Sequence, residues 1–174
     1  MEASYTPQDL LELAIGIEES GRRVYEHFEG AAKDEGLKGV WRLLKDQEAD
    51  HRRTFERLRR DAGPGLKAED SSAQATPYLR AIASSALFSE ARLARMVLEG
   101  IDSDLDALQV AIAVEKDSVF FYITIKDHLI GDQGRVLEEI IAEEKLHLVR
   151  LVELRDKLAG GPAPEPAPDL PTGL

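Results

Sequence analysis

One pattern of residues occurs twice in this chain, and this repeat limits the folds open to it more than any other feature. Its first part is Ala14-Ile15-Gly16-Ile17-Glu18, which matches Ala111-Ile112-Ala113-Val114-Glu115, and a tyrosine follows each glutamate after seven residues, at Tyr25 and Tyr122. In its second part, the matched residues are Leu44, Glu48, His51, Phe55 and Leu58 in one copy and Ile140, Glu144, His147, Leu151 and Leu154 in the other. The offset is 97 residues in the first part and 96 in the second, so the copies differ by one residue in a loop. The repeat predicts two copies of one structural unit, packed about a pseudo-twofold axis.

Both parts of each copy have the apolar spacing of long amphipathic helices. The sequence predicts four helices: from Pro7 to about residue 33, from beyond Gly39 to about Ala62, from about Ser103 to Leu129, and from about Arg135 to Ala159. Thr6 and Pro7 suit the start of the first helix, as its cap and its first residue. The hairpin turns are expected at Gly36 and Gly39 and at residues 131–134, because glycine interrupts helices.

A long connection, residues 63–102, separates the two hairpins. It is expected to contain one or two short helices, around Pro77–Ala83 and Leu87–Glu99. No segment alternates with period two, so no sheet is expected. The order hairpin, crossover, hairpin predicts an all-α fold, a ferritin-like antiparallel four-helix bundle over residues 1–159. Residues 160–174 hold five of the eight prolines and are expected to form a flexible tail.

The composition excludes several classes of protein and of site. A net charge of -11 argues against nucleic-acid partners, because their phosphates would repel such a surface. The lack of cysteine excludes disulfides, thiolate zinc sites and iron–sulfur centres, which all need thiolates. The first residues lack the basic and apolar regions of a signal peptide, and no apolar run approaches the roughly 20 residues of a membrane span. We therefore expect a cytoplasmic protein that does not bind membranes.

Each copy of the repeat carries a Glu-x-x-His motif on a predicted helix. The motif residues are Glu48 and His51 in the first copy, and Glu144 and His147 in the second. Residues three apart lie on one helix face, about 5–6 Å apart at Cβ, so a glutamate and a histidine at this spacing can bind one site together. Glu18 and Glu115 lie upstream of the motifs, each within an apolar stripe. Buried carboxylates need partners, and four of them balance two divalent cations, so the pattern predicts a dinuclear metal site. A buried hydrogen-bond network is the alternative.

Aromatic side chains accompany the predicted ligands. Tyr25 and Tyr122 fall two turns after Glu18 and Glu115, on the same helix faces. Core packing is one interpretation of these tyrosines; in the other, each hydroxyl hydrogen-bonds a ligand carboxylate or the ring donates an electron. Trp41 matches a leucine in the other copy, and we expect it to pack in the core rather than to relay electrons.

Other ionisable residues near the motifs are expected on the surface. They are His27, His128, Glu19 and Glu143. At about 100° per residue, the two histidines fall nearly opposite the upstream glutamates of their helices. The two glutamates adjoin predicted ligands but point about 100° away from them, so a surface position is expected rather than contact with a ligand.

Oxygen-rich sites with one imidazole per ion suit iron or manganese, so we expect two iron ions, with manganese as the second choice. The order of ligands, the crossover and the repeat resemble the ferritin-like di-iron superfamily, specifically its rubrerythrin-like branch, over residues 8 to 159. The resemblance implies that Glu48 and Glu144 bridge the irons and take part in catalysis with the other carboxylates. The remaining ligands would be Glu18 and His51 for one ion, and Glu115 and His147 for the other.

The resemblance also implies an activity: oxidation of Fe(II) by O2 or H2O2, or reduction of H2O2, in iron and peroxide detoxification. Ser118 stands where rubrerythrins typically carry an extra glutamate, which favours a six-ligand, ferroxidase-like site. Ala49 stands where bacterioferritins place a haem-binding methionine, so no haem is expected. Without cysteine the chain has no rubredoxin domain, and a peroxidase would need an external electron donor.

Two further expectations concern partners. The resemblance implies a homodimer. The alternative to an enzyme is a non-catalytic metal-binding bundle that acts as an interaction or cargo protein. The Pro-rich tail is expected to be a disordered spacer, and its alternative role, by resemblance to ferritin-like cargo proteins, is docking to the shell of a protein nanocompartment.

Overall fold

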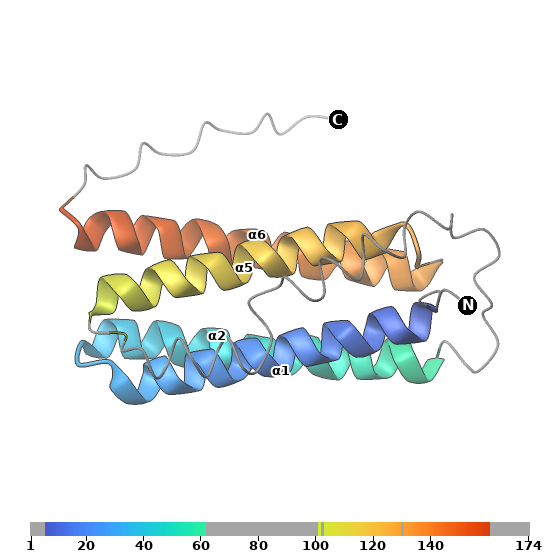
Figure 1. Cartoon of the computed structure of the whole chain (residues 1–174), viewed down its shortest axis with the longest axis horizontal. Coiled ribbons are helices and arrows are strands. Elements are labelled where there is room, and N and C mark those ends of the chain that lie inside the picture. Colours follow the sequence, from blue (N-terminus) through green and yellow to red (C-terminus); the bar gives the residue numbers. More distant parts are fainter. Residues whose placement is uncertain (1–5, 62–100, 102, 130, 161–174) are drawn as a thin grey trace, which may run out of the picture.

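In a computed structural model, the protein is a bundle of four long helices (Figure 1). The structure describes residues 6–61, 101, 103–129 and 131–160. The helices are α1 (Pro7–Ala31), α2 (Glu35–Asp61), α5 (Asp104–Lys126) and α6 (Asp132–Leu158). The described residues contain no strand, and the predicted all-α bundle is confirmed. The short helices expected at 77–83 and 87–99, and the Pro-rich tail, lie outside the described residues.

The helices pair as the repeat predicts. α1 and α2 lie side by side as one hairpin, and α5 and α6 as the other (Figure 1). In the first hairpin, Thr6 forms a capping box at the start of α1: its hydroxyl accepts from the Asp9 N–H at 3.2 Å, and the Asp9 carboxylate accepts from the Thr6 N–H at 2.8 Å. In the second, the Ser103 hydroxyl caps α5 by accepting from the Asp106 N–H at 3.2 Å.

The predicted turns are partly wrong. Gly36 and Gly39 lie within α2, which begins at Glu35, because the Asp34 carboxylate accepts a hydrogen bond from the Leu37 N–H at 2.9 Å and caps the helix. Gly134 likewise lies within α6. Of the glycines in the second turn, Gly131 has a positive φ of 60°, which reverses the chain before α6.

The core has two apolar clusters with a polar layer between them. One apolar cluster includes Leu10, Leu11, Ile17, Phe55, Phe121 and Tyr122. The other includes Tyr25, Phe28, Trp41, Leu44, Leu108 and Leu151. The layer between them holds the buried acidic and imidazole side chains that the sequence singles out. Such side chains are rarely buried without partners, so this layer is the place where function is expected.

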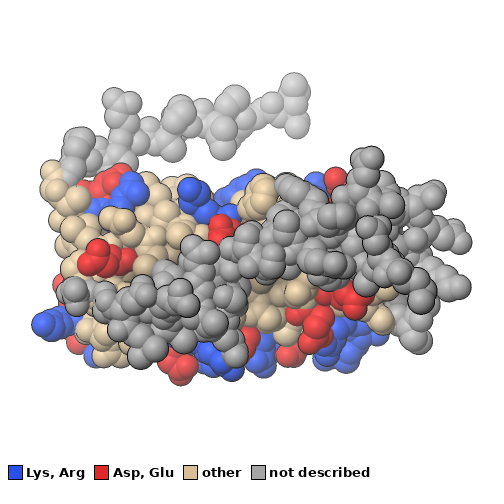
Figure 2. All heavy atoms as spheres, viewed as in Figure 1, with Lys and Arg blue, Asp and Glu red and all other residues tan. Residues whose placement is uncertain are grey.

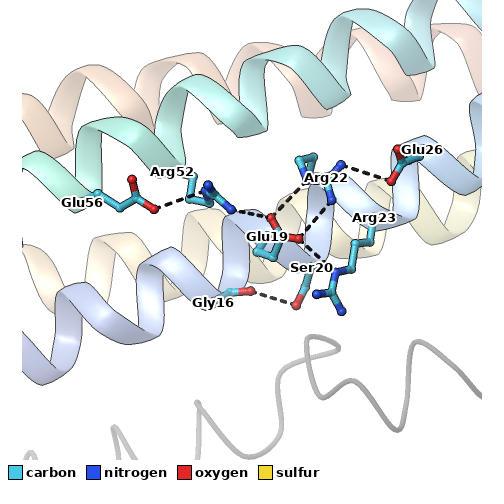
Figure 3. Close-up of polar contacts among 8 residues, drawn as sticks. All are labelled: Gly16, Glu19, Ser20, Arg22, Arg23, Glu26, Arg52 and Glu56. Atoms are coloured by element: carbon cyan, nitrogen blue, oxygen red, sulfur yellow. Dashed lines mark hydrogen bonds and ion pairs between the residues drawn. The ribbon is translucent and has the colours of Figure 1, made fainter.

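Charged side chains of both signs cover the outside of the first hairpin. Lys and Arg alternate with Asp and Glu along the edge formed by α1 and α2 (Figure 2). In one network there, Glu19 accepts hydrogen bonds from Arg22, Arg23 and Arg52, the last of them on α2 (Figure 3). None of the described helices is both long and apolar enough to cross a membrane.

Candidate metal centre

The structure brings together all six residues that the sequence predicts as ligands. We call them the Glu/His cluster: Glu18 from α1, Glu48 and His51 from α2, Glu115 from α5, and Glu144 and His147 from α6. Each is at most 4% exposed. Their ligand atoms form two groups, and within each group one atom per residue lies within 4.8 Å of the others. One group is Glu48, Glu115, Glu144 and His147, and the second is Glu18, His51 and Glu144.

Glu144 lies between the two imidazoles and belongs to both groups. Its Oε1 is 2.8 Å from Nδ1 of His51, and its Oε2 is 3.0 Å from Nδ1 of His147. The upstream glutamates are farther away but equivalent, since Glu18 Oε2 and Glu115 Oε1 each lie 3.7 Å from the Nδ1 of their own histidine. Each histidine thus has Glu144 at close range and its own upstream glutamate at 3.7 Å, as a pseudo-twofold repeat predicts.

The two tyrosines connect the hairpins through the cluster. Tyr25 Oη donates to Glu115 Oε1 at 2.6 Å, and Tyr122 Oη donates to Glu18. Each tyrosine is fully buried, so burial, and then the nearby carboxylates, raise the pKa of its hydroxyl well above the ordinary value. The hydroxyls therefore remain hydrogen-bond donors. Both interpretations of the tyrosines hold in part, because they pack in the core and also orient the two upstream carboxylates.

The carboxylates of the cluster have divergent proton affinities. Burial raises the pKa of Glu48 well above its ordinary value, and the Glu18 and Glu144 carboxylates raise it further. Burial and Glu144 raise the pKa of Glu115 in the same way. For Glu144, burial acts in that direction too, but the two imidazoles outweigh it and lower the pKa. Without a metal, the cluster therefore holds protons at Glu48 and Glu115, and Glu144 is the anion between the histidines.

His51 is the cationic member of this arrangement. Burial lowers its pKa, but the Glu144 and Glu18 carboxylates more than offset this effect and bring the pKa to about 12. A proton on His51 occupies the position where a metal ion would bind its Nδ1. Metal binding must therefore displace protons from the cluster.

The donor atoms of the cluster fit metal ions. Five buried atoms of the cluster have no assigned hydrogen-bond partner among the described residues: Glu18 Oε2, His51 Nδ1, Glu115 Oε2, Glu144 Oε1 and His147 Nε2. Such atoms are costly to bury unless they bind a cation. An oxygen-rich set with two imidazoles matches iron or manganese better than zinc, calcium or magnesium. The buried cluster is compatible with a dinuclear site.

Small residues flank the cluster at equivalent positions of the repeat, Gly21 and Ser118. A Cβ at Gly21 would lie 2.8 Å from Glu48 Oε2, so glycine provides the space that this carboxylate occupies. Ser118 is buried, and its hydroxyl donates to the Val114 carbonyl of its own helix at 3.2 Å. Neither position offers a seventh carboxylate.

One residue expected on the surface contacts a predicted ligand. The Glu143 carboxylate is 2.8 Å from His51 Nε2 and accepts its hydrogen bond, although the Glu143 side chain is 54% exposed. A rotation of 100° from Glu144 places this side chain at the edge of the bundle, where it reaches His51 on α2 and also contacts solvent. The surface position predicted for Glu143 is confirmed, but the prediction that it does not contact a ligand is wrong. The signal for this contact was its position directly before the glutamate of a Glu-x-x-His motif.

The other candidates lie outside the cluster. His27 is exposed, as predicted, while His128 is half-buried beyond the end of α5. Glu19 is half-buried in the arginine network of α1 and α2. Trp41 is buried and stacks on Tyr25 with a ring-centroid distance of 6.0 Å, as a core residue does.

Comparisons with known proteins agree with this geometry. The family model described as Rubrerythrin matches residues 9–155. The fold matches a crystal structure from Thermotoga maritima, of a protein described as a ferritin-like diiron-carboxylate protein, with a TM-score of 0.66 and 26% sequence identity. That match covers 91% of this chain and 99% of the other. No curated protein matches the sequence. The chain belongs to the rubrerythrin family, within the ferritin-like di-iron proteins, as its ligand pattern and repeat predict.

Proposed function

We propose that this protein is a di-iron oxidoreductase that oxidises Fe(II) with O2 or H2O2 at the Glu/His cluster. The observation that carries this proposal is the pair of overlapping ligand groups that share Glu144. Two sites joined by a common carboxylate suit two ions that act together, whereas a structural metal needs only one closed site. The family membership and the Thermotoga maritima structure support iron as the metal.

Each residue of the cluster has a role in this proposal. Glu144 and Glu48 would bridge the two ions. One ion would be completed by Glu18 and His51, and the other by Glu115 and His147. When bound, an iron pair supplies two electrons, which reduce O2 to H2O2 or H2O2 to water. Burial of the cluster keeps bulk water from the ions, while Tyr25 and Tyr122 hold the two terminal carboxylates in position.

The six-residue set favours Fe(II) oxidation over peroxide reduction by an external donor. For an enzyme that reduces peroxide with an external donor, the resemblance predicts a further glutamate at the position of Ser118. Here a hydroxyl occupies that position and bonds to its own helix, so it does not compete for an ion. Fe(II) would then be substrate as well as electron donor. Reduction of H2O2 with electrons from a separate protein is the secondary candidate.

The test is anaerobic loading of the protein with Fe(II), followed by O2 or H2O2, with Fe(III) formation measured by absorbance. We expect rapid oxidation of about two Fe(II) ions per chain, because the cluster offers ligands for two. Glu144→Ala removes the shared ligand and should abolish this fast phase. Glu139→Ala on the same helix is the matched control, since that side chain is 63% exposed and pairs with Arg135.

Two outcomes would count against the proposal. A fast phase that persists in Glu144→Ala would show that iron is oxidised elsewhere on the protein. A wild-type protein that binds two ions but is inert to both oxidants would instead support the non-catalytic interaction or cargo protein. Loss of the fast phase in Glu139→Ala would show that the assay responds to general damage.

A further inference from the structure

The two halves of the centre differ at the far side of the histidines. Each imidazole directs Nδ1 toward the cluster and Nε2 away from it. Nε2 of His51 donates to the Glu143 carboxylate at 2.8 Å. Nε2 of His147 is equally buried, yet it has no hydrogen-bond partner among the described residues. The repeat therefore breaks down at this contact.

The residue that corresponds to Glu143 is Gln47. It lies 96 residues earlier, and each of the two directly precedes the glutamate of a Glu-x-x-His motif. From the pseudo-twofold relation, we infer that Gln47 lies on the side of His147 that corresponds to the place of Glu143 beside His51. Its Oε1 is also buried and, within the part of the chain that the structure describes, has no hydrogen-bond partner. The available acceptor for His147 is thus a neutral amide, in place of a carboxylate.

The contacts of the histidines and of the upstream glutamates match between the halves, while Glu48 belongs only to the ligand group of His147. Tyr122 donates to Glu18, and Tyr25 donates to Glu115. Glu144 contacts both histidines at similar distances, 2.8 and 3.0 Å. Outside the ligand groups themselves, the acceptor behind each histidine is therefore the difference between the two ion positions.

An acceptor on the far nitrogen changes how strongly an imidazole binds a metal. A carboxylate fixes the ring and increases the electron density at the ligating nitrogen. Loss of such a partner lowers metal affinity roughly 10- to 100-fold. Glu143 is 54% exposed, so water screens its charge and the lower end of that range applies. An amide gives orientation without the negative charge.

We propose that Glu143 and Gln47 make the two ion positions unequal. The ion held by His51 and Glu18 binds first and stays bound, and the ion held by His147 and Glu115 binds second and exchanges. The inference rests on the proposed dinuclear centre and deepens it: one ion is resident, and the other position admits Fe(II) as substrate. Glu143 and Gln47 are positioning residues, which act on the ions through the histidines.

The experiment is an anaerobic titration with Co(II), followed by calorimetry and by the visible spectrum of each bound ion. The wild type should bind two ions in separate steps, about 10-fold apart in affinity. Glu143→Gln should weaken the tighter step, and Gln47→Glu should strengthen the weaker one; either change should bring the two steps together. The double variant should restore two separate steps with the order of the two spectra reversed. A purely structural role of either residue would not produce this reversal.

The possible failures are distinguishable. If the wild type does not bind two ions, the dinuclear centre itself is refuted, together with the proposed function. If it binds two ions in equal steps, or if neither single variant changes the separation, the inequality is refuted and the proposed function stands. Thermal unfolding of the metal-free variants checks that they fold. The two substitutions change the charge in opposite directions, so if one variant does not fold, the other still tests the proposal.

Discussion

Gly21 allows the Glu48 carboxylate to enter the core beside α1. A Cβ at this position would lie 2.8 Å from Oε2 and 3.1 Å from Cδ of Glu48, closer than real Cβ contacts. The helix would have to move away, or the carboxylate would have to leave its place in the cluster. Glycine costs about 1 kcal/mol relative to alanine inside a helix, and at Gly21 the proposed metal centre accounts for that cost.

Gly21→Ala should therefore weaken metal binding on the order of 10-fold, because it displaces Glu48, a proposed ligand. A Co(II) titration measures the change. Gly16→Ala is the control in the same helix: no atom lies within 4 Å of its added Cβ. That variant should raise the free energy of unfolding by about 0.5–1 kcal/mol in urea and leave metal affinity unchanged. Equal metal affinities in the two variants would contradict this account of Gly21.

The members of the Glu/His cluster were predictable from the sequence, but the contacts that support them were less so. Glu18 and Glu115 stand out because a carboxylate in an apolar stripe conflicts with the helical pattern. Glu143 does not lie in an apolar stripe, since its side chain is half exposed, so it gives no signal of this kind. Its role depends on where α2 lies, and only the packed structure supplies that information.

At the scale of the helices, the ends proved harder to predict than the faces. The pattern of apolar residues located the four helices, but Gly36 and Gly39 suggested a turn where α2 already runs. The stronger signal was Asp34, whose carboxylate caps the first turn of α2. Glycine lowers helix stability by about 1 kcal/mol, which a cap and a buried face readily offset.

The outer faces of α1 and α2 are joined by the Glu19 network (Figure 3). The hydrogen bond from Arg22, opposed by burial and assisted by Arg23 and Arg52, lowers the pKa of Glu19 to about 2. A lowered pKa contributes stability above the unfolded value of 4.5, and this contribution is lost as the pH falls toward 2. The side chain is 25% exposed, so screening by water reduces the effect to about 1 kcal/mol.

Glu19→Gln should thus lower the free energy of unfolding by about 1 kcal/mol at neutral pH, and the difference from the wild type should shrink as the pH falls from about 4.5 to 2. Urea unfolding of the metal-free protein across this range measures both. Glu26→Gln is the matched control, because Glu26 is 58% exposed and contacts Arg22 alone of the three arginines. A difference for Glu19→Gln that does not depend on pH would exclude the charge as its cause.

For the whole molecule, the cluster lies where the two hairpins meet, between two apolar regions of the core. Each hairpin supplies three members of the cluster and one tyrosine that donates to the other hairpin. Metal binding would therefore tie the halves together. In the metal-free protein, protons take that role: burial and neighbouring carboxylates raise the pKa values of Glu48 and Glu115, and His51 is held protonated by Glu144 and Glu18.

These shifts fix the sign of the pH dependence. A group with a raised pKa stabilises the folded protein below its unfolded pKa, and this stabilisation is lost as the pH rises through the folded value. The metal-free protein should therefore lose stability as the pH rises above 4.5, because these carboxyls ionise there in the unfolded chain while Glu48 and Glu115 keep their protons in the folded protein. Metal ions compete with the same protons, so the stabilisation that they provide should grow over that range.

Thermal unfolding with and without Mn(II), which O2 does not readily oxidise, tests both trends at several pH values. Calorimetry in buffers of different ionisation enthalpy should also show that binding releases protons, because Glu48 and His51 must lose theirs to bind an ion. A Glu48→Gln variant carries no proton to release at that position, so fewer protons should leave when metal binds. Binding without proton release, or stabilisation by Mn(II) that is constant with pH, would mean that the ions bind outside the Glu/His cluster.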